Sequence, residues 1–130
     1  MRAMLACVLI LGLGSCATQA EVRASAPSGA ATLEGAWTVD LSTDPNSPYT
    51  KPMVLNLAAD GTVTGSFYES EIIGGRWRAD RGRTCVSFRT TDGVGPYHTA
   101  ACLVGDHVEG QTWAEQRGFL FNWNAVRAVS

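Results

Sequence analysis

The chain has 130 residues, which suits one domain of ordinary size. Its formal net charge is −2 and only 17% of its residues are charged, which argues against a polyanion-binding surface and against intrinsic disorder. Hydrophobic residues make up 45%, and the chain holds 14 glycines and four tryptophans. This composition favours a β-rich domain with a real core.

The first sixteen residues have the features of an export signal. Arg2 supplies a positive charge, and residues 4–13 form an uncharged apolar run that is too short to span a bilayer. The run ends in LGSC, residues 13–16, which resembles the lipobox, so the whole segment resembles a bacterial lipoprotein signal. The resemblance implies removal of the signal before Cys16, lipidation of that cysteine, and anchoring in the bacterial envelope, at the outer membrane facing the periplasm. An ordinary secretory signal, cut near residues 18–20, is the alternative, and both predict export.

The segment after the signal predicts a tether, and the remaining cysteines predict a disulfide. Residues 17–32 are small, polar and aperiodic, which is typical of a flexible linker before a domain at residues 33–130. Of four cysteines, one lies in the signal and Cys16 would carry lipid, which leaves Cys85 and Cys102. In an oxidising periplasm such a pair usually forms a disulfide, and two buried free thiols are the alternative.

Segments with a period of two alternate with turn residues through the rest of the chain. They predict eight strands, at residues 35–41, 52–58, 62–69, 72–79, 84–90, 97–104, 107–114 and 118–127. Four connectors contain aspartate and glycine, at residues 60–61, 80–82, 92–93 and 105–106, and these residues tolerate the backbone of tight turns. Only residues 42–50 form a long connection. We therefore expect an all-β fold, an eight-stranded antiparallel up-and-down barrel without exposed sheet edges.

The hydrophobic pattern predicts the register of two hairpins. A three-residue loop at residues 59–61 keeps apolar residues facing one another, whereas a two-residue loop would bring them opposite polar ones. The expected pairs are Met53 with Phe67, Leu55 with Gly65 and Leu57 with Val63. A turn centred on Gly93-Val94 would pair Phe88 with Thr99, Val86 with Ala101 and Cys85 with Cys102. Directly opposed cysteines are close enough for a disulfide.

The last strand predicts how the barrel closes. One face of residues 118–127 carries four apolar residues and then Arg127, so this face should point inward. In a closed barrel the last strand pairs with the first. We therefore expect Arg127 to stack on Trp37 as a structural contact.

Several stretches resemble known families of barrels. GAW at residues 35–37, with a basic residue closing the last strand, is similar to a pattern of lipocalins, fatty-acid-binding proteins and avidins. Residues 33–37 and 59–70 look more specifically like avidin and streptavidin. The resemblance implies a calycin-type barrel. Val39, Phe67 and Glu69 stand where avidins have an asparagine, a tyrosine and a serine that bind biotin, so we do not expect biotin binding.

The later part of the chain carries a second resemblance. Residues 92–97, 109–112 and 117–120 are similar to a set of small exported bacterial proteins of unassigned function. This resemblance implies no activity.

No motif predicts catalysis or a cofactor. His98 and His107 lack the spacing of metal ligands, and no phosphate loop or catalytic serine motif occurs. Glu69 and Glu71 could form an acid–base pair, but a solvated barrel rim is the simpler interpretation. We therefore expect a protein that is not an enzyme and holds no metal.

An arginine-rich stretch lies in the predicted fourth hairpin. Four arginines within residues 76–83 surround Trp77, a pattern that can bind single-stranded nucleic acid. An exported acidic protein rarely meets nucleic acid, so we expect no such partner. Contact with anionic lipid head groups is more plausible, and a salt-bridged outer face is the simplest interpretation.

Two functions remain as hypotheses. The barrel could bind a small apolar or amphipathic ligand against aromatic side chains, for which the candidates are Trp37, Phe67, Trp77, Trp113 and Trp123. Alternatively, a filled barrel could bind a protein, as an enzyme inhibitor or a subunit of an envelope complex, through the loop at residues 42–50. An eight-stranded barrel can either fill with side chains or hold one small molecule, so its interior separates the two hypotheses. The sequence does not indicate an oligomeric state.

Overall fold

The fold is taken from a computed structural model, which describes residues 28–129. The expected signal, the lipidation site at Cys16 and the tether up to residue 27 lie outside the described residues. Within the described part, no helix has the length and apolar character that a membrane crossing requires.

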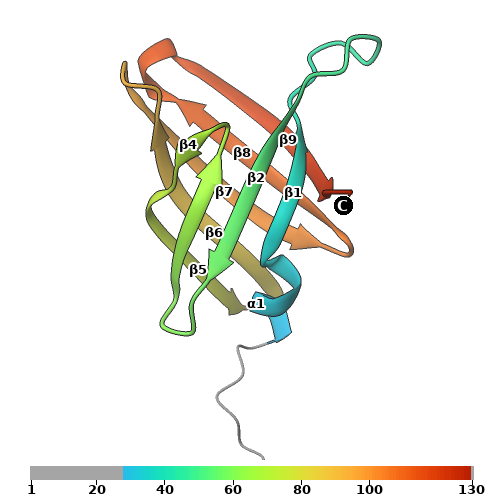
Figure 1. Ribbon diagram of the computed structural model, residues 1–130, viewed down its shortest axis with the longest axis vertical. Coiled ribbons are helices and arrows are strands. Elements are labelled where there is room, and N and C mark those ends of the chain that lie inside the picture. Colours follow the sequence, from blue (N-terminus) through green and yellow to red (C-terminus); the bar gives the residue numbers. More distant parts are fainter. Residues whose placement is uncertain (1–27, 130) are drawn as a thin grey trace, which may run out of the picture.

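The described chain forms one closed antiparallel β-barrel (Figure 1). The strands are β1 (Gly35–Asp40), β2 (Thr50–Leu57), β3 (Thr62–Phe67), β4 (Ser70–Glu71), β5 (Ile73–Asp80), β6 (Arg83–Thr91), β7 (Pro96–Val104), β8 (His107–Ala114) and β9 (Phe119–Arg127). β4 and β5 pair in turn with β3, so together they make one wall of the barrel. β1 pairs with both β2 and β9, which closes the sheet. The predicted eight-stranded up-and-down barrel is confirmed.

The β2–β3 hairpin has the predicted register. Met53 faces Phe67 and Leu57 faces Val63, across a loop of residues 59–61. Between these pairs Leu55 faces Gly65, where an added Cβ would collide with the backbone of Val54. Glycine is therefore needed where the two strands approach so closely.

The β6–β7 hairpin also has the predicted register. Phe88 faces Thr99, Val86 faces Ala101, and Cys85 faces Cys102. The two cysteines form a disulfide with their Cα atoms 4.0 Å apart. The bond therefore links neighbouring strands directly across the hairpin, as predicted.

The turn between β3 and β4 differs from the prediction. The expected strands left residues 70–71 as the turn, but the chain turns at Tyr68 and Glu69, whose φ angles are +54° and +64°. Phe67 faces Ser70, and Ile72 follows as a buried residue between β4 and β5. Turning two residues earlier and bulging the strand after β4 lets both apolar side chains reach the core.

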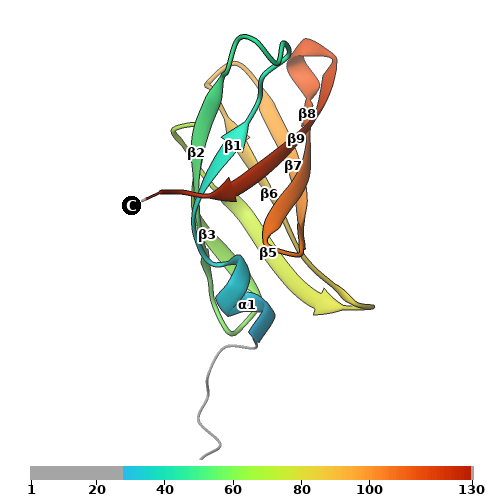
Figure 2. The ribbon, with the colours of Figure 1, turned by 90° about the vertical axis from the view of Figure 1, so that its right-hand side faces the viewer.

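A short helix, α1 (Ser28–Leu33), precedes the first strand. Residues 28–32 were expected in the tether, and that part of the prediction is wrong. Ala30 and Leu33 are at most 1% exposed. The helix thus covers one end of the barrel, called here the closed end (Figures 1 and 2). Six residues are too few to show a helical period, and packing on the barrel stabilises the helix.

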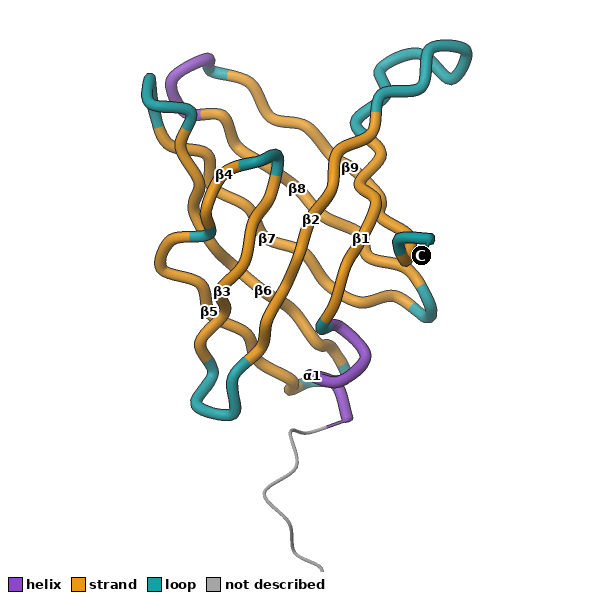
Figure 3. The backbone as a smooth tube through the Cα atoms, viewed as in Figure 1, coloured by secondary structure: helices purple, strands orange, loops and turns teal. Residues whose placement is uncertain are grey.

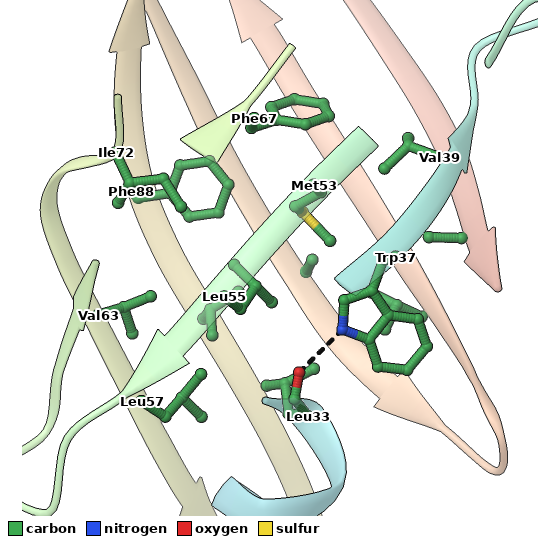
Figure 4. Close-up of a cluster of buried hydrophobic side chains, with 14 of the residues drawn as sticks. Leu33, Trp37, Val39, Met53, Leu55, Leu57, Val63, Phe67, Ile72 and Phe88 are labelled. Atoms are coloured by element: carbon green, nitrogen blue, oxygen red, sulfur yellow. Dashed lines mark hydrogen bonds between the residues drawn. The ribbon is translucent and has the colours of Figure 1, made fainter. Parts of the chain in front are cut away.

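The packed core occupies the closed end. Trp37 lies beside α1 and donates a hydrogen bond of 2.9 Å from its indole Nε1 to the carbonyl oxygen of Leu33 (Figure 4). Arg127 faces Trp37 across β1 and β9, with its guanidinium carbon 4.0 Å from the centre of the indole ring. The predicted stacking of these two side chains is therefore confirmed.

The other end of the barrel, called here the mouth, carries four connections (Figure 3). They are residues 41–49, residues 68–69, residues 92–95 and the short 3-10 helix η2 (Glu115–Arg117). Apart from this single 3-10 turn, no helix lies at the mouth among the described residues.

Candidate functional site: a cavity in the mouth of the barrel

A cavity of about 440 Å³ opens between the four connections of the mouth. It is lined by Leu41, Ser42, Thr43, Tyr49, Phe67, Tyr68, Ser70, Thr90, Asp92, Tyr97, Thr112, Ala114, Arg117, Phe119, Phe121 and Asn122. Sites for small molecules usually measure about 300–1,000 Å³ and combine apolar walls with a few polar groups. The size and the lining of this mouth cavity therefore suit one small molecule.

Aromatic rings form much of the wall. Phe67 projects inward from β3 and lies 5.5 Å from Trp123 and 6.0 Å from Phe88 between ring centres. Phe119 and Phe121 project from β9, with ring centres 5.4 Å apart. Phe67 is 3% exposed, whereas Phe119, nearer the edge, is 52% exposed. The rings thus extend from the core to the rim and give the cavity apolar walls.

Hydroxyl groups line the wall formed by β6 and β8. The buried polar residues among those described are Thr90, Thr99 and Thr112. Thr99 and Thr112 share a hydrogen bond of 2.9 Å between their hydroxyls, and the indole Nε1 of Trp123 donates to the Thr112 hydroxyl at 2.9 Å. These bonds fix the Trp123 ring beneath the cavity.

Two tyrosines join separate parts of the rim. The phenol groups of Tyr49, at the end of the long loop, and Tyr68, in the β3–β4 turn, hydrogen-bond each other. This bond to Tyr49, together with burial, raises the pKa of Tyr68 to about 12. Lys51 lies beside the pair, with its Nζ 5.0 Å from the centre of the Tyr68 ring and 3.6 Å from the Glu69 carboxylate.

A second polar cluster centres on Asp92. Its carboxylate accepts hydrogen bonds from the Tyr97 phenol at 2.7 Å and from the backbone N–H groups of Val94 and Gly95 at 2.9 and 3.2 Å. Arg117 of η2 adds a contact at 3.4 Å. These groups, the Tyr97 phenol above all, lower the pKa of Asp92 to about 2.

The charges of the lining therefore compensate each other. Asp92 and Arg117 are its charged residues, and they face each other within the cluster. A carboxylate has about four acceptor positions, and the protein's own donors occupy those of Asp92. The cavity thus presents hydroxyl and aromatic groups to a ligand rather than an unpaired charge.

The structure distributes the five predicted ligand-binding residues over different places. Phe67 lines the mouth cavity. Trp123 is 3% exposed and lies behind Phe67, while Trp37 is 1% exposed in the core of the closed end. Trp77 is half-buried, with its indole Nε1 donating to the Ala58 carbonyl at 2.7 Å. Trp113 lies on the outer surface with 41% of its area exposed.

Sequence reasoning missed most of the lining. Thr90, Thr112 and Phe121 lie on the inward faces that strand alternation defines, so the pattern contained a signal for them. Tyr49, Tyr68 and Arg117 come from connections, where alternation carries no information. The residue type of a tryptophan does not tell how far along the barrel axis its side chain lies.

The other groups with possible chemistry lie apart from the cavity. Glu69 contacts Lys51 in the turn, and Glu71 is exposed on β4. His98 lies on the outer surface, 2.8 Å from the Glu115 carboxylate. In the part of the chain that the structure describes, no three His, Cys, Asp or Glu side chains could together hold a metal ion.

The arginine-rich hairpin forms part of the outer surface. Arg76 and Arg78 are exposed on β5, on either side of the half-buried Trp77. Arg78 lies 2.8 Å from Asp80 along the same strand. At this position the structure thus shows an exposed ion pair.

Searches against models of protein families, curated proteins and solved structures find no match to this chain. The resemblance to avidins and lipocalins is therefore supported only by the shared architecture of a closed antiparallel barrel.

Proposed function

We propose that this protein binds a small apolar or amphipathic molecule in the mouth cavity. The observation that carries the proposal is the unfilled space of about 440 Å³ between aromatic and hydroxyl side chains at one end of a barrel whose other end is packed. The closed end supplies a rigid base, and a ligand enters from the mouth. Burial of the ligand against the phenylalanine and tyrosine rings supplies the driving force.

The division of the interior supports this proposal over a filled module. Side chains pack the barrel from α1 up to Phe67 and Trp123, and the cavity begins above these two rings. A barrel that served only as a scaffold for a protein-binding loop would gain stability by filling this space as well.

Fluorescence titration with N-phenyl-1-naphthylamine, a neutral aromatic probe, tests the proposal. We expect saturable enhancement of the probe's emission at one site per chain. The Ala114→Phe variant, which adds a ring to a buried residue of the lining, should abolish the enhancement. The matched control is Ala100→Phe, which adds the same ring to an exposed position of β7. Enhancement that never saturates, or that Ala114→Phe leaves unchanged, contradicts ligand binding in the cavity.

Binding of a protein partner through the long loop is the second candidate. Residues 43–49 are exposed, and the tip of this loop projects beyond the barrel (Figure 1). Replacing the exposed tip at residues 44–47 by alanine should abolish capture of an envelope partner and leave the naphthylamine titration unchanged. Unaltered capture by this variant argues against the loop as an interface.

We also propose that the chain is lipid-anchored in the bacterial envelope and related to the calycins. The LGSC motif at residues 13–16 supports the anchor. The stacking of Arg127 on Trp37, the tryptophan of the GAW motif, supports the relationship. Because α1 lies at the closed end, an anchor before it would leave the mouth at the far end of the barrel. Labelled palmitate should enter the wild-type protein and not Cys16→Ser, and equal labelling of both refutes lipidation at this residue.

A further inference from the structure

We infer that the ligand of the mouth cavity is a neutral molecule with a carbonyl or hydroxyl oxygen, and that Thr90 selects it through a hydrogen bond. This inference rests on the proposed function and specifies the chemistry of the ligand. One buried hydroxyl, that of Thr90, has no partner within the fold.

Thr90 lines the cavity from β6 and is 5% exposed. Its hydroxyl makes no hydrogen bond to any residue between 28 and 129, although burial of an unpaired hydroxyl is costly. Among the described residues, no side-chain oxygen or nitrogen that is sealed from solvent lacks a partner. The Thr90 oxygen is therefore not sealed, and it reaches the space of the cavity.

The neighbouring threonines provide the contrast. Thr99 and Thr112 are also buried, and their hydroxyls bond to each other. Thr112 also holds the Trp123 indole. Two of the three buried threonines thus have structural partners within the protein. Valine has the shape of threonine and suits a strand equally well, so packing alone gives no reason for a hydroxyl at position 90.

The rest of the lining indicates that the bonded group is neutral. The Asp92 carboxylate already accepts four contacts, and Arg117 compensates its charge. A carboxylate or an ammonium ion that entered the cavity would lose hydration without gaining an unpaired counter-charge. A ketone, an ester or an alcohol can bond to Thr90 without this loss. Its ring or chain would then lie against Phe67 and Phe121.

Selectivity follows from displacement of water. In the free protein, water in the cavity can satisfy the Thr90 hydroxyl. A hydrocarbon that displaces this water leaves the hydroxyl unpaired, whereas a ligand oxygen replaces the lost bond. A site with a buried hydrogen-bonding group therefore rejects the analogue that lacks the partner.

The test uses 1-tetralone and tetralin, two neutral probes with the same fused ring that differ in one carbonyl oxygen. Each probe competes with N-phenyl-1-naphthylamine for the wild-type protein and for Thr90→Val. We expect Thr90→Val to lower the affinity for 1-tetralone by roughly tenfold. The affinity for tetralin should stay unchanged or rise. Thr90→Ser, which retains the hydroxyl, should keep the wild-type preference for the ketone.

Two controls separate the ligand contact from a structural effect. Thr64→Val makes the same change at an exposed position of β3 and should leave both affinities unchanged. Because Thr90 has no hydrogen bond to lose, Thr90→Val should also unfold at the same urea concentration as the wild type, or at a higher one.

The outcomes distinguish the two levels of the proposal. If the wild type binds neither tetralone nor tetralin nor the naphthylamine, ligand binding in the cavity is refuted, and the selection by Thr90 with it. If the wild type binds them and Thr90→Val changes the affinities for tetralin and tetralone equally, or changes neither, the cavity remains a binding site and the role of Thr90 is refuted.

Discussion

The indole ring of Trp123 on β9 occupies the space in which a side chain at Gly110, its partner on β8, would stand. Gly110 does not have a positive φ angle, so its role is to make room rather than to relax the backbone. The accommodated ring lies against Phe67 and donates its N–H to Thr112. This glycine therefore sets the level at which the packed core ends and the cavity begins.

Gly110→Ala should lower the free energy of unfolding by about 1–3 kcal/mol, because the added methyl group displaces the indole from a close-packed site. Urea unfolding followed by tryptophan fluorescence measures the effect. Gln111→Ala, at the adjacent exposed position, should change stability by less than about 0.5 kcal/mol. Equal stability of Gly110→Ala and the wild type would show that the Trp123 indole can move aside without loss of packing.

Arg127 should stabilise the closed end through its guanidinium group rather than through its charge. Besides stacking on Trp37, it donates hydrogen bonds to the backbone carbonyls of Glu34, at 2.6 Å, and Thr32. These bonds tie the last strand to the end of α1. Arg127→Lys cannot reproduce the planar fork, so both Lys and Met at this position should cost about 1–3 kcal/mol.

The matched control for Arg127 is Arg78→Met. Arg78 is 82% exposed in its side chain and makes one ion pair, with Asp80, so its loss should cost between 0 and about 1 kcal/mol. Urea midpoints of the three variants give the comparison. Full stability of Arg127→Lys would show that a cation alone suffices at the closed end.

The Cys85–Cys102 disulfide should contribute mainly by restricting the unfolded chain. The two cysteines are 17 residues apart. A disulfide that closes a loop of about this length stabilises the folded protein by roughly 3 kcal/mol. The Cys85→Ala/Cys102→Ala double variant should therefore unfold at a lower urea concentration, and a reductant should bring the wild type to the same midpoint. The double variant itself should not respond to the reductant, and a shift there would mean that the reductant acts elsewhere.

The sequence predicts the strands and two registers well because burial on one face of a strand is a strong local constraint. A shift of one residue between β2 and β3 would have exposed Met53, Leu55 and Leu57 together, so only one alignment remained. The opposition of Cys85 and Cys102 followed from the same alternation once the turn near Gly93 was fixed. The disulfide was thus predictable as a matter of geometry.

The position of the cavity was not predictable in the same way. Alternation tells whether a side chain points inward, but its height along the axis depends on the tilt and stagger of the closed sheet. Trp37 and Phe67 both point inward, yet one lies in the core beside α1 and the other borders the cavity. Alternation did not predict the position of the Tyr68 side chain, because this residue reaches the rim from a turn with positive φ.

Acid should loosen the mouth through Asp92. Its pKa in the folded protein is about 2, against about 3.9 in an unfolded chain, so folding favours the ionised carboxylate. The stabilisation from this group is present in full above about pH 4 and is lost as the pH falls towards 2. Asp92→Asn should therefore lower stability near neutral pH and flatten the decline in stability between pH 4 and pH 2.

Urea midpoints from pH 2 to pH 6 measure this slope for the wild type, for Asp92→Asn and for Asp106→Asn, the same change at an exposed turn of the closed end. Asp106→Asn should retain the slope of the wild type, and an equally steep slope in Asp92→Asn would show that Asp92 does not control the acid sensitivity of the mouth.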